Sequence, residues 1–175
     1  MRVVGYRVYR ASSSGGGCLR SWVMDTVWGQ GENRAACDET ACGRPPARHT
    51  GPTGCGFHAF AHLRSLRTYL DVQRLEEERA RRPIPWCGPS GPSVICALVA
   101  GSGTVQLGRH GWRADRAEIV LLFGGSSMAE RMANRYQVPL VPLPQDLERT
   151  ERLLGGEWGL THEEALRLPA EFEAA

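Results

Sequence analysis

The feature that most constrains this chain is a run of cysteine and histidine residues between positions 37 and 58. Its spacing is Cys37-x4-Cys42-x6-His49-x5-Cys55-x2-His58, and it holds three of the six cysteines and two of the five histidines. The residues between them are mainly Gly, Pro, Arg and Thr, so the run offers few apolar side chains for a buried face. Thiolates and imidazoles are the ligands that zinc prefers, and four of them complete a tetrahedral structural site. We therefore expect a zinc-knuckle-like loop over residues 29–58.

The expected ligands are Cys37, His49 and Cys55, with Cys42, His58 or a cysteine distant in sequence as the fourth. The spacing matches no standard zinc finger, because it contains one C-x2-H and no C-x2-C. Two other interpretations stay open: reduced cysteines that are small buried apolar residues, and a redox pair. The metal interpretation is favoured because little else would hold such a loop together.

Charge and terminal sequence bear on the partner and the compartment. All 21 basic residues are Arg, a usage that a GC-rich coding bias explains, and 19 acidic residues leave a net charge of +2. Arginine suits phosphate and carboxylate recognition, but this net charge is too small to indicate a nucleic-acid-binding surface by itself. Residues 1–7 contain no apolar leader, and no window approaches the roughly 18 apolar residues of a membrane span. We expect a cytoplasmic protein without a membrane segment, whose thiols stay reduced.

The hydrophobic pattern predicts an α+β fold in which a small, mostly antiparallel sheet is flanked by helices. The expected elements are a hairpin of residues 2–10 and 18–28, a helix from 57–59 to about 82, strands at 94–101, 104–107 and 117–123 separated by glycine turns, and helices at about 127–136, at 144–154 and from 161 onward. We expect one domain over residues 1–142, which includes the knuckle, and a C-terminal helical extension over residues 143–175.

The segment 108–116 is the best candidate contact surface outside the knuckle. It places Trp112 among basic side chains, Arg109, His110 and Arg113. An aromatic ring flanked by Arg and His can stack on a base or hold an anion. The alternative is a hairpin turn in which Trp112 packs onto the sheet and the Arg side chains are solvated.

Several scattered motifs resemble an uncharacterised family of small proteins that is frequent in GC-rich actinobacteria. They are the Gly5-Tyr6-Arg7-Val8-Tyr9-Arg10 run, the pattern Trp28-x2-Gly31-x-Asn33-x-Ala35-x-Cys37, the pattern His49-x2-Pro52-x2-Cys55-Gly56-Phe57-x-Ala59, the Gly111-Trp112-Arg113-Ala114 run and Arg135-Tyr136-x-Val138-Pro139. Relatives often carry C-x-C-G where this chain has Thr53-Gly54-Cys55-Gly56, and a threonine cannot replace a thiolate ligand. The resemblance implies a metal-type knuckle on a small β-rich body and brings no known activity.

Two function classes follow from these observations. The favoured one is a zinc-stabilised binding or adaptor module whose partner is a protein, because the net charge is low, with a nucleic acid as the second choice of partner. The alternative is a small metal-dependent hydrolase or nucleic-acid-processing enzyme that uses the same Cys/His cluster. A structural site has four protein ligands, whereas a catalytic site keeps a position for water.

Overall fold

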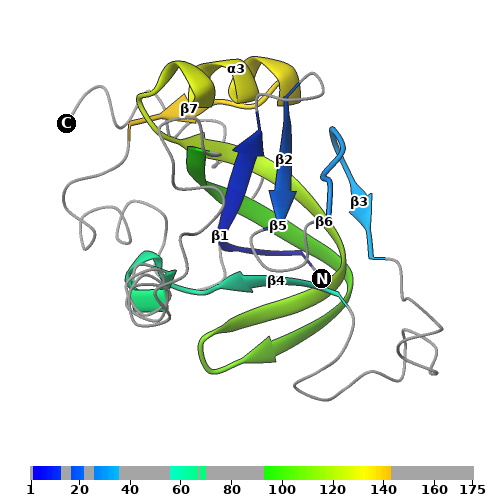
Figure 1. Ribbon diagram of the computed structural model, residues 1–175. Coiled ribbons are helices and arrows are strands. Elements are labelled where there is room, and N and C mark those ends of the chain that lie inside the picture. The colour runs from blue at the N-terminus through cyan, green and yellow to red at the C-terminus, as the bar shows by residue number, and fades with distance from the viewer. Residues whose placement is uncertain are drawn as a thin grey trace, which may run out of the picture.

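Strands make up most of the described chain. The structure, a computed structural model, describes residues 2–12, 17–21, 26–35, 56–66, 68–69 and 93–142. The elements in chain order are β1 (Val3–Ser12), β2 (Cys18–Ser21), β3 (Asn33–Arg34), β4 (Phe57–Phe60), β5 (Ser93–Gly108), β6 (Gly111–Phe123), α3 (Ser127–Tyr136) and β7 (Leu140–Val141) (Figure 1). Residues 63–66 and 68–69 are also helical. The described part of the chain is therefore mostly a sheet with few helices, which is compatible with the expected α+β class.

Four of the strands close into a ring. β1 pairs with β5, β5 with β6, β6 with β4, and β4 returns to β1 through the pair Tyr6–Phe60, all antiparallel. β2 extends β1 as a hairpin, β3 adds to β6, and β7 pairs with β6 in parallel. This arrangement is a small barrel with short strands at its margins.

The ring encloses the larger of two apolar clusters, and α3 covers one end of it (Figure 1). Every ring strand contributes, and the most deeply buried large residues of this cluster include Tyr9, Leu19, Trp28, Ile95 and Leu122. Helix α3 adds one face, consisting of Ala129, Met132, Ala133 and Tyr136. The Tyr136 hydroxyl accepts a hydrogen bond from the Leu19 N–H (2.9 Å) and donates one to the Trp28 carbonyl (2.7 Å), which fixes the helix to the barrel.

The second apolar cluster lies on the outer face of the same strands. Val4, Tyr6 and Val8 alternate with the inward-facing residues of β1, and Leu63 and Leu66 of the helical stretch pack in the same cluster. Residues three apart share a helix face, so these two leucines form one contact surface. Both faces of β1 are therefore largely buried.

Three sequence predictions are confirmed. The N-terminal hairpin forms, although β2 ends at Ser21 in the described chain. The antiparallel character of the sheet is as expected, apart from the parallel β6–β7 pair. Helix α3 spans the predicted residues. The sequence Ser127-Met128-Ala129-Glu130 has capping-box spacing, which indicates Ser127 as the N-cap, whereas the N-cap in the structure is Ser126.

Two element predictions are wrong. Residues 57–60 are a strand and do not begin the helix, because Phe57 and Ala59 alternate into the barrel while the backbone pairs with β6. Residues 93–108 are one strand without a glycine turn. Gly103, with φ +77°, lies in a bulge that bends β5, where the Thr104 N–H donates to Asp115 Oδ1 (2.9 Å).

The helices expected at 144–154 and from 161 onward lie outside the described residues, as does the extension 143–175. Within the described residues, the structure contains no helix of the length and apolarity that a membrane crossing requires.

Candidate binding surface at the hairpin tip

Most of the predicted metal ligands lie outside the described part of the chain. Cys37, Cys42, His49 and Cys55 all belong to that group, so the zinc site stays a prediction. The fifth, His58, is exposed on β4. Among the described residues no group of three or more His, Cys, Asp or Glu side chains lies together in a way that could hold a metal ion.

The second predicted site forms the tip of the β5–β6 hairpin. The two strands pair from Val105–Ala114 to Gly108–Gly111, so that Arg109 and His110 make a two-residue turn and are both exposed. On the other side of β6, β4 pairs with residues 111–114. The Ala61 N–H donates to the His110 carbonyl (3.0 Å), which fastens the turn to the end of β4.

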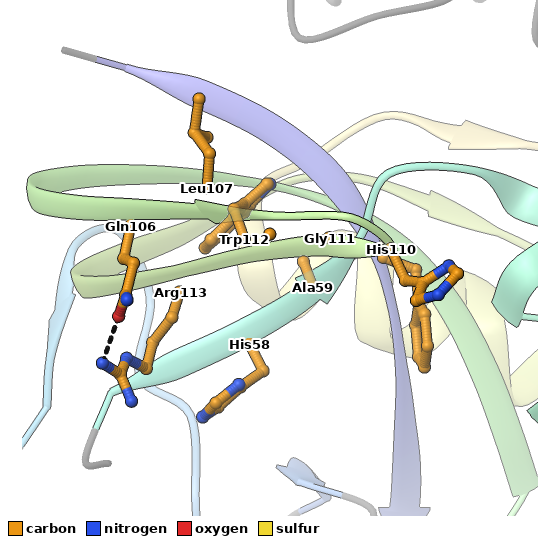
Figure 2. Close-up of a pocket in the computed structure, with 10 residues that line it drawn as sticks. His58, Ala59, Gln106, Leu107, His110, Gly111, Trp112 and Arg113 are labelled. Carbon is orange, nitrogen blue, oxygen red and sulfur yellow. Dashed lines mark hydrogen bonds between the residues drawn. The ribbon is translucent and has the colours of Figure 1, made fainter. Parts of the chain in front are cut away.

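Strand pairing brings three polar side chains into one row. Gln106 is the partner of Arg113 across β5 and β6, and Arg113 is the partner of His58 across β6 and β4. Directly opposite residues project from the same face of a sheet, and their Cβ atoms lie about 4.5–5.5 Å apart. The Arg113 guanidinium donates to Gln106 Oε1, and all three side chains point to the same side of the sheet (Figure 2).

This row lies along a hollow of about 500 Å³. The hollow is lined by His58, Ala59, Phe60, Gln106, Leu107, Gly108, His110, Gly111, Trp112 and Arg113 (Figure 2). The lining contains one Arg and two His but no Asp or Glu, and its apolar side chains are Ala59, Phe60, Leu107 and Trp112. Such a surface can hold a carboxylate or another anion beside an apolar group.

Trp112 has a packing role in this structure. It is 3% exposed, and its Nε1 donates to the Val4 carbonyl (2.8 Å). Glycines of two neighbouring strands make room for the indole, since a Cβ atom at Gly5 or at Gly101 would lie 2.5 Å from it. The structure therefore matches the alternative in which the Trp packs onto the sheet, and it leaves Arg109, His110 and Arg113 as the accessible members of the predicted set.

Gly56 keeps β4 close to the Arg113 side chain. Its φ is +133°, and a Cβ at this position would lie 2.8 Å from Arg113 Cγ. A residue with a side chain would be strained here and would push the Arg113 stem away from its present place. The sequence offered no sign of this contact, because it joins residues that are 57 positions apart only through the β4–β6 pairing.

Gln106, Phe60 and Leu107 are surface residues that the sequence analysis did not single out. The pairing register of β5 with β6 could have identified Gln106 and Leu107. Once Arg109 and His110 are taken as a two-residue turn, counting back along β5 sets Gln106 opposite Arg113 and Leu107 opposite Trp112.

A second arginine, Arg7, lies in the wall of the barrel and is not among the residues that line the hollow. Arg7 donates to the His58 carbonyl and to Ser21 Oγ (2.8 Å), and its Cζ lies 5.2 Å from the centre of the Trp28 ring. Burial lowers the pKa of its guanidinium. β4 pairs with β1 at Tyr6, and β2 pairs with β1 from Tyr9 onward. Arg7 lies between these two pairings, and its hydrogen bonds connect β2 to β4.

Comparison with family models, curated proteins and solved structures gives no match to this chain.

Proposed function

We infer that the protein is a zinc-stabilised cytoplasmic binding module that recognises a protein partner through the hairpin-tip surface, meaning His58, Phe60, Gln106, Leu107, Arg109, His110 and Arg113. The observation that carries the inference is the row Gln106–Arg113–His58 along an open hollow at the protruding end of a closed barrel. Leu107, Arg109 and His110 are exposed there, so this end of the sheet presents an apolar and two basic side chains to a partner.

The low net charge favours a protein over a nucleic acid. Three basic side chains at the tip, Arg109, His110 and Arg113, are a small set against the 6–10 phosphate contacts of a strongly salt-dependent nucleic-acid binder. An acidic patch or segment of a protein needs only one or two such contacts beside apolar ones.

The metal part of the proposal rests on the sequence. Cys55 and the three other ligand candidates outside the described chain precede β4, whose first residues form one wall of the hollow. A four-ligand zinc site there would hold the chain that leads into His58. Elemental analysis of protein purified without chelator should give about one zinc per chain, and Cys55→Ser should lose both the metal and thermal stability. A metal-free native protein would remove zinc from the proposal.

The binding part is tested by charge reversal at two ends of the molecule. Ligands selected from a random peptide library against the wild-type protein should bind Arg113→Glu at least about tenfold more weakly. Arg131→Glu is the matched control, because Arg131 is exposed on α3, at the other end of the barrel (Figure 1). Ligands that bind both variants like the wild type would contradict the assignment of the hairpin tip.

A further inference from the structure

At the hairpin tip, one edge of β5 extends beyond its pairing with β1. β1 pairs with β5 only between Ser93 and Gly101, whereas β6 pairs with β5 as far as Gly108. Residues 105–108 therefore have β6 on one side and, within the described chain, no strand on the other. In an antiparallel ladder, residues alternate in the side to which they direct their N–H and C=O groups. This edge thus presents backbone groups to which another strand can add.

The side chains along this edge alternate in chemistry. Val105 and Leu107 share the face of Ala114 and Trp112, their partners on β6, and Leu107 is 50% exposed. Gln106 lies on the opposite face, where it accepts a hydrogen bond from Arg113. Figure 2 shows Leu107 and Gln106 on opposite sides of the hairpin. A strand added here would meet an apolar face on one side and an amide with a guanidinium on the other.

Charge selects the kind of strand that fits. Arg109 and His110 flank the end of the edge, and Arg113 lies one strand behind it on the polar face. The residues that line the hollow include no Asp or Glu. A second copy of this chain would bring a second Arg109–Arg113 set against the first, and like charges across strands are unfavourable. A strand that carries carboxylates complements the same set.

We propose that residues 105–108 of β5 take up an extended, acidic segment of a protein partner by strand addition. In the bound segment, apolar side chains alternate with carboxylates. The apolar ones lie over Val105 and Leu107, and a carboxylate lies beside Gln106 within reach of Arg113. The Arg113 guanidinium already extends across β5 to Gln106. Neighbouring strands are about 4.8 Å apart, so a Glu on an added strand, opposite Gln106, lies within reach of the same guanidinium. This proposal rests on the proposed function and names the ligand class of its surface.

Synthetic peptides test the proposal without altering the protein. The probe is the acetylated, amidated peptide Thr-Val-Glu-Val-Glu-Val-Thr, and the charge control replaces both Glu by Lys. Two backbone controls each carry two N-methyl groups, one control on the amides of the two Glu residues and the other on the amides of the second and third Val residues. In calorimetric titrations the Glu peptide should bind at least about tenfold more tightly than the Lys peptide. One of the two N-methylated peptides should lose binding by a similar factor and the other should not, because only one set of amides faces β5.

The outcomes separate this inference from the proposed function. If both N-methylated peptides bind as well as the parent, or if the Glu and Lys peptides bind equally, strand addition by an acidic segment is overturned. If the library-selected ligands nevertheless bind Arg113→Glu more weakly than the wild type, the hairpin tip remains the binding surface, and only binding by strand addition is rejected. Leu107→Thr provides a protein-side check, since threonine keeps β propensity while weakening the apolar contact. This variant should bind the Glu peptide several-fold more weakly and keep the wild-type melting temperature.

Discussion

The barrel wall around Arg7 and the hairpin tip around Arg113 contain similar residues but differ in burial. Each combines an arginine, a tryptophan and a polar partner: Arg7 with Trp28 and Ser21, and Arg113 with Trp112 and Gln106. His58 contributes to both, because its carbonyl accepts from Arg7 while its side chain is exposed beside the hollow. In the wall the guanidinium is buried, donates to the His58 carbonyl and to Ser21 Oγ, and leaves its Nε without a hydrogen-bond partner in the described structure. At the tip the guanidinium lines an accessible hollow. Residue type alone did not separate the two regions; their positions on the strands did.

The largest expected difference between the two regions is in stability. Trp28 is 2% exposed and its ring centre lies 5.0 Å from that of Tyr9 and 4.7 Å from that of Phe57. Trp28→Ala should therefore lower the free energy of unfolding by about 3–5 kcal/mol, as other large core truncations do. Urea denaturation followed by circular dichroism gives the value. A loss below about 1 kcal/mol would mean that Trp28 does not anchor the core.

Tyr136→Phe tests the polar connection between α3 and the barrel. The substitution keeps the ring but leaves the buried Leu19 N–H and Trp28 carbonyl without their hydroxyl partner. An unsatisfied buried group costs about 1–3 kcal/mol, so we expect a loss in this range from the same denaturation measurement. Retention of wild-type stability would show that this hydroxyl does not hold the helix.

Tyr9→Phe is the same substitution as Tyr136→Phe, but it should not lower the stability. The Tyr9 side chain is fully buried, and its hydroxyl has no hydrogen-bond partner in the described structure. Removal of an unsatisfied buried hydroxyl should leave stability at neutral pH unchanged or slightly raised. A loss above about 1 kcal/mol at pH 7 would point to a partner for this hydroxyl.

The same variant has a signature at alkaline pH. Burial raises the pKa of the Tyr9 hydroxyl far above its ordinary value of 10.0. As the pH rises above 10, the unfolded chain therefore loses this proton before the folded one, and the wild-type protein loses up to about 1.4 kcal/mol of stability per pH unit from this group. Tyr9→Phe should fall less steeply between pH 10 and 11. Parallel slopes for the two proteins would exclude Tyr9 as a source of alkaline unfolding.

The smallest stability effect is expected at the hairpin tip. Arg109→Ser should change the free energy of unfolding by less than about 0.5 kcal/mol, because Arg109 lies exposed in the turn. The same substitution should weaken the binding of the library-selected peptides, since it removes one of the positive charges at the hairpin tip. A destabilisation comparable with Trp28→Ala would mean that the tip is part of the folding core, and the contrast between the two regions would disappear.

The sequence predicted the elements that rest on local signals and missed those that rest on pairing. The N-terminal hairpin and α3 follow from alternation around a Ser/Gly turn and from a capping box, and both are present. The sequence predicts a helix from residues 57–59 onward because the apolar residues from Phe60 to Leu75 fall close to a helical stripe. Residues 57–60 form a strand instead, because they pair with β6, which lies more than 50 positions away in the chain. The break predicted at Gly101–Gly103 is a bulge, which depends on Asp115 from the opposite strand.

For the candidate site, the sequence located the hairpin tip but could not sort its residues by face. Trp112 and Arg113 are neighbours in sequence, yet Trp112 packs on Gly5 and Gly101 and is 3% exposed, whereas Arg113 lies on the opposite face of β6 in the row with Gln106 and His58. Alternate residues of a strand face opposite sides of the sheet, so the face of each residue is known only once the pairing register is known. The Cys/His run from Cys37 to Cys55 lies outside the described residues, so the zinc prediction awaits elemental analysis.

The most direct test of the account is to map a bound ligand onto the protein by amide NMR. The tightest library-selected peptide should shift backbone signals of β4 and of residues 102–114, and leave those of α3 and β2 unchanged. Such a pattern would place recognition at the hairpin tip and leave the barrel as its support. Shifts centred on α3 or β2, with the tip unaffected, would contradict the account.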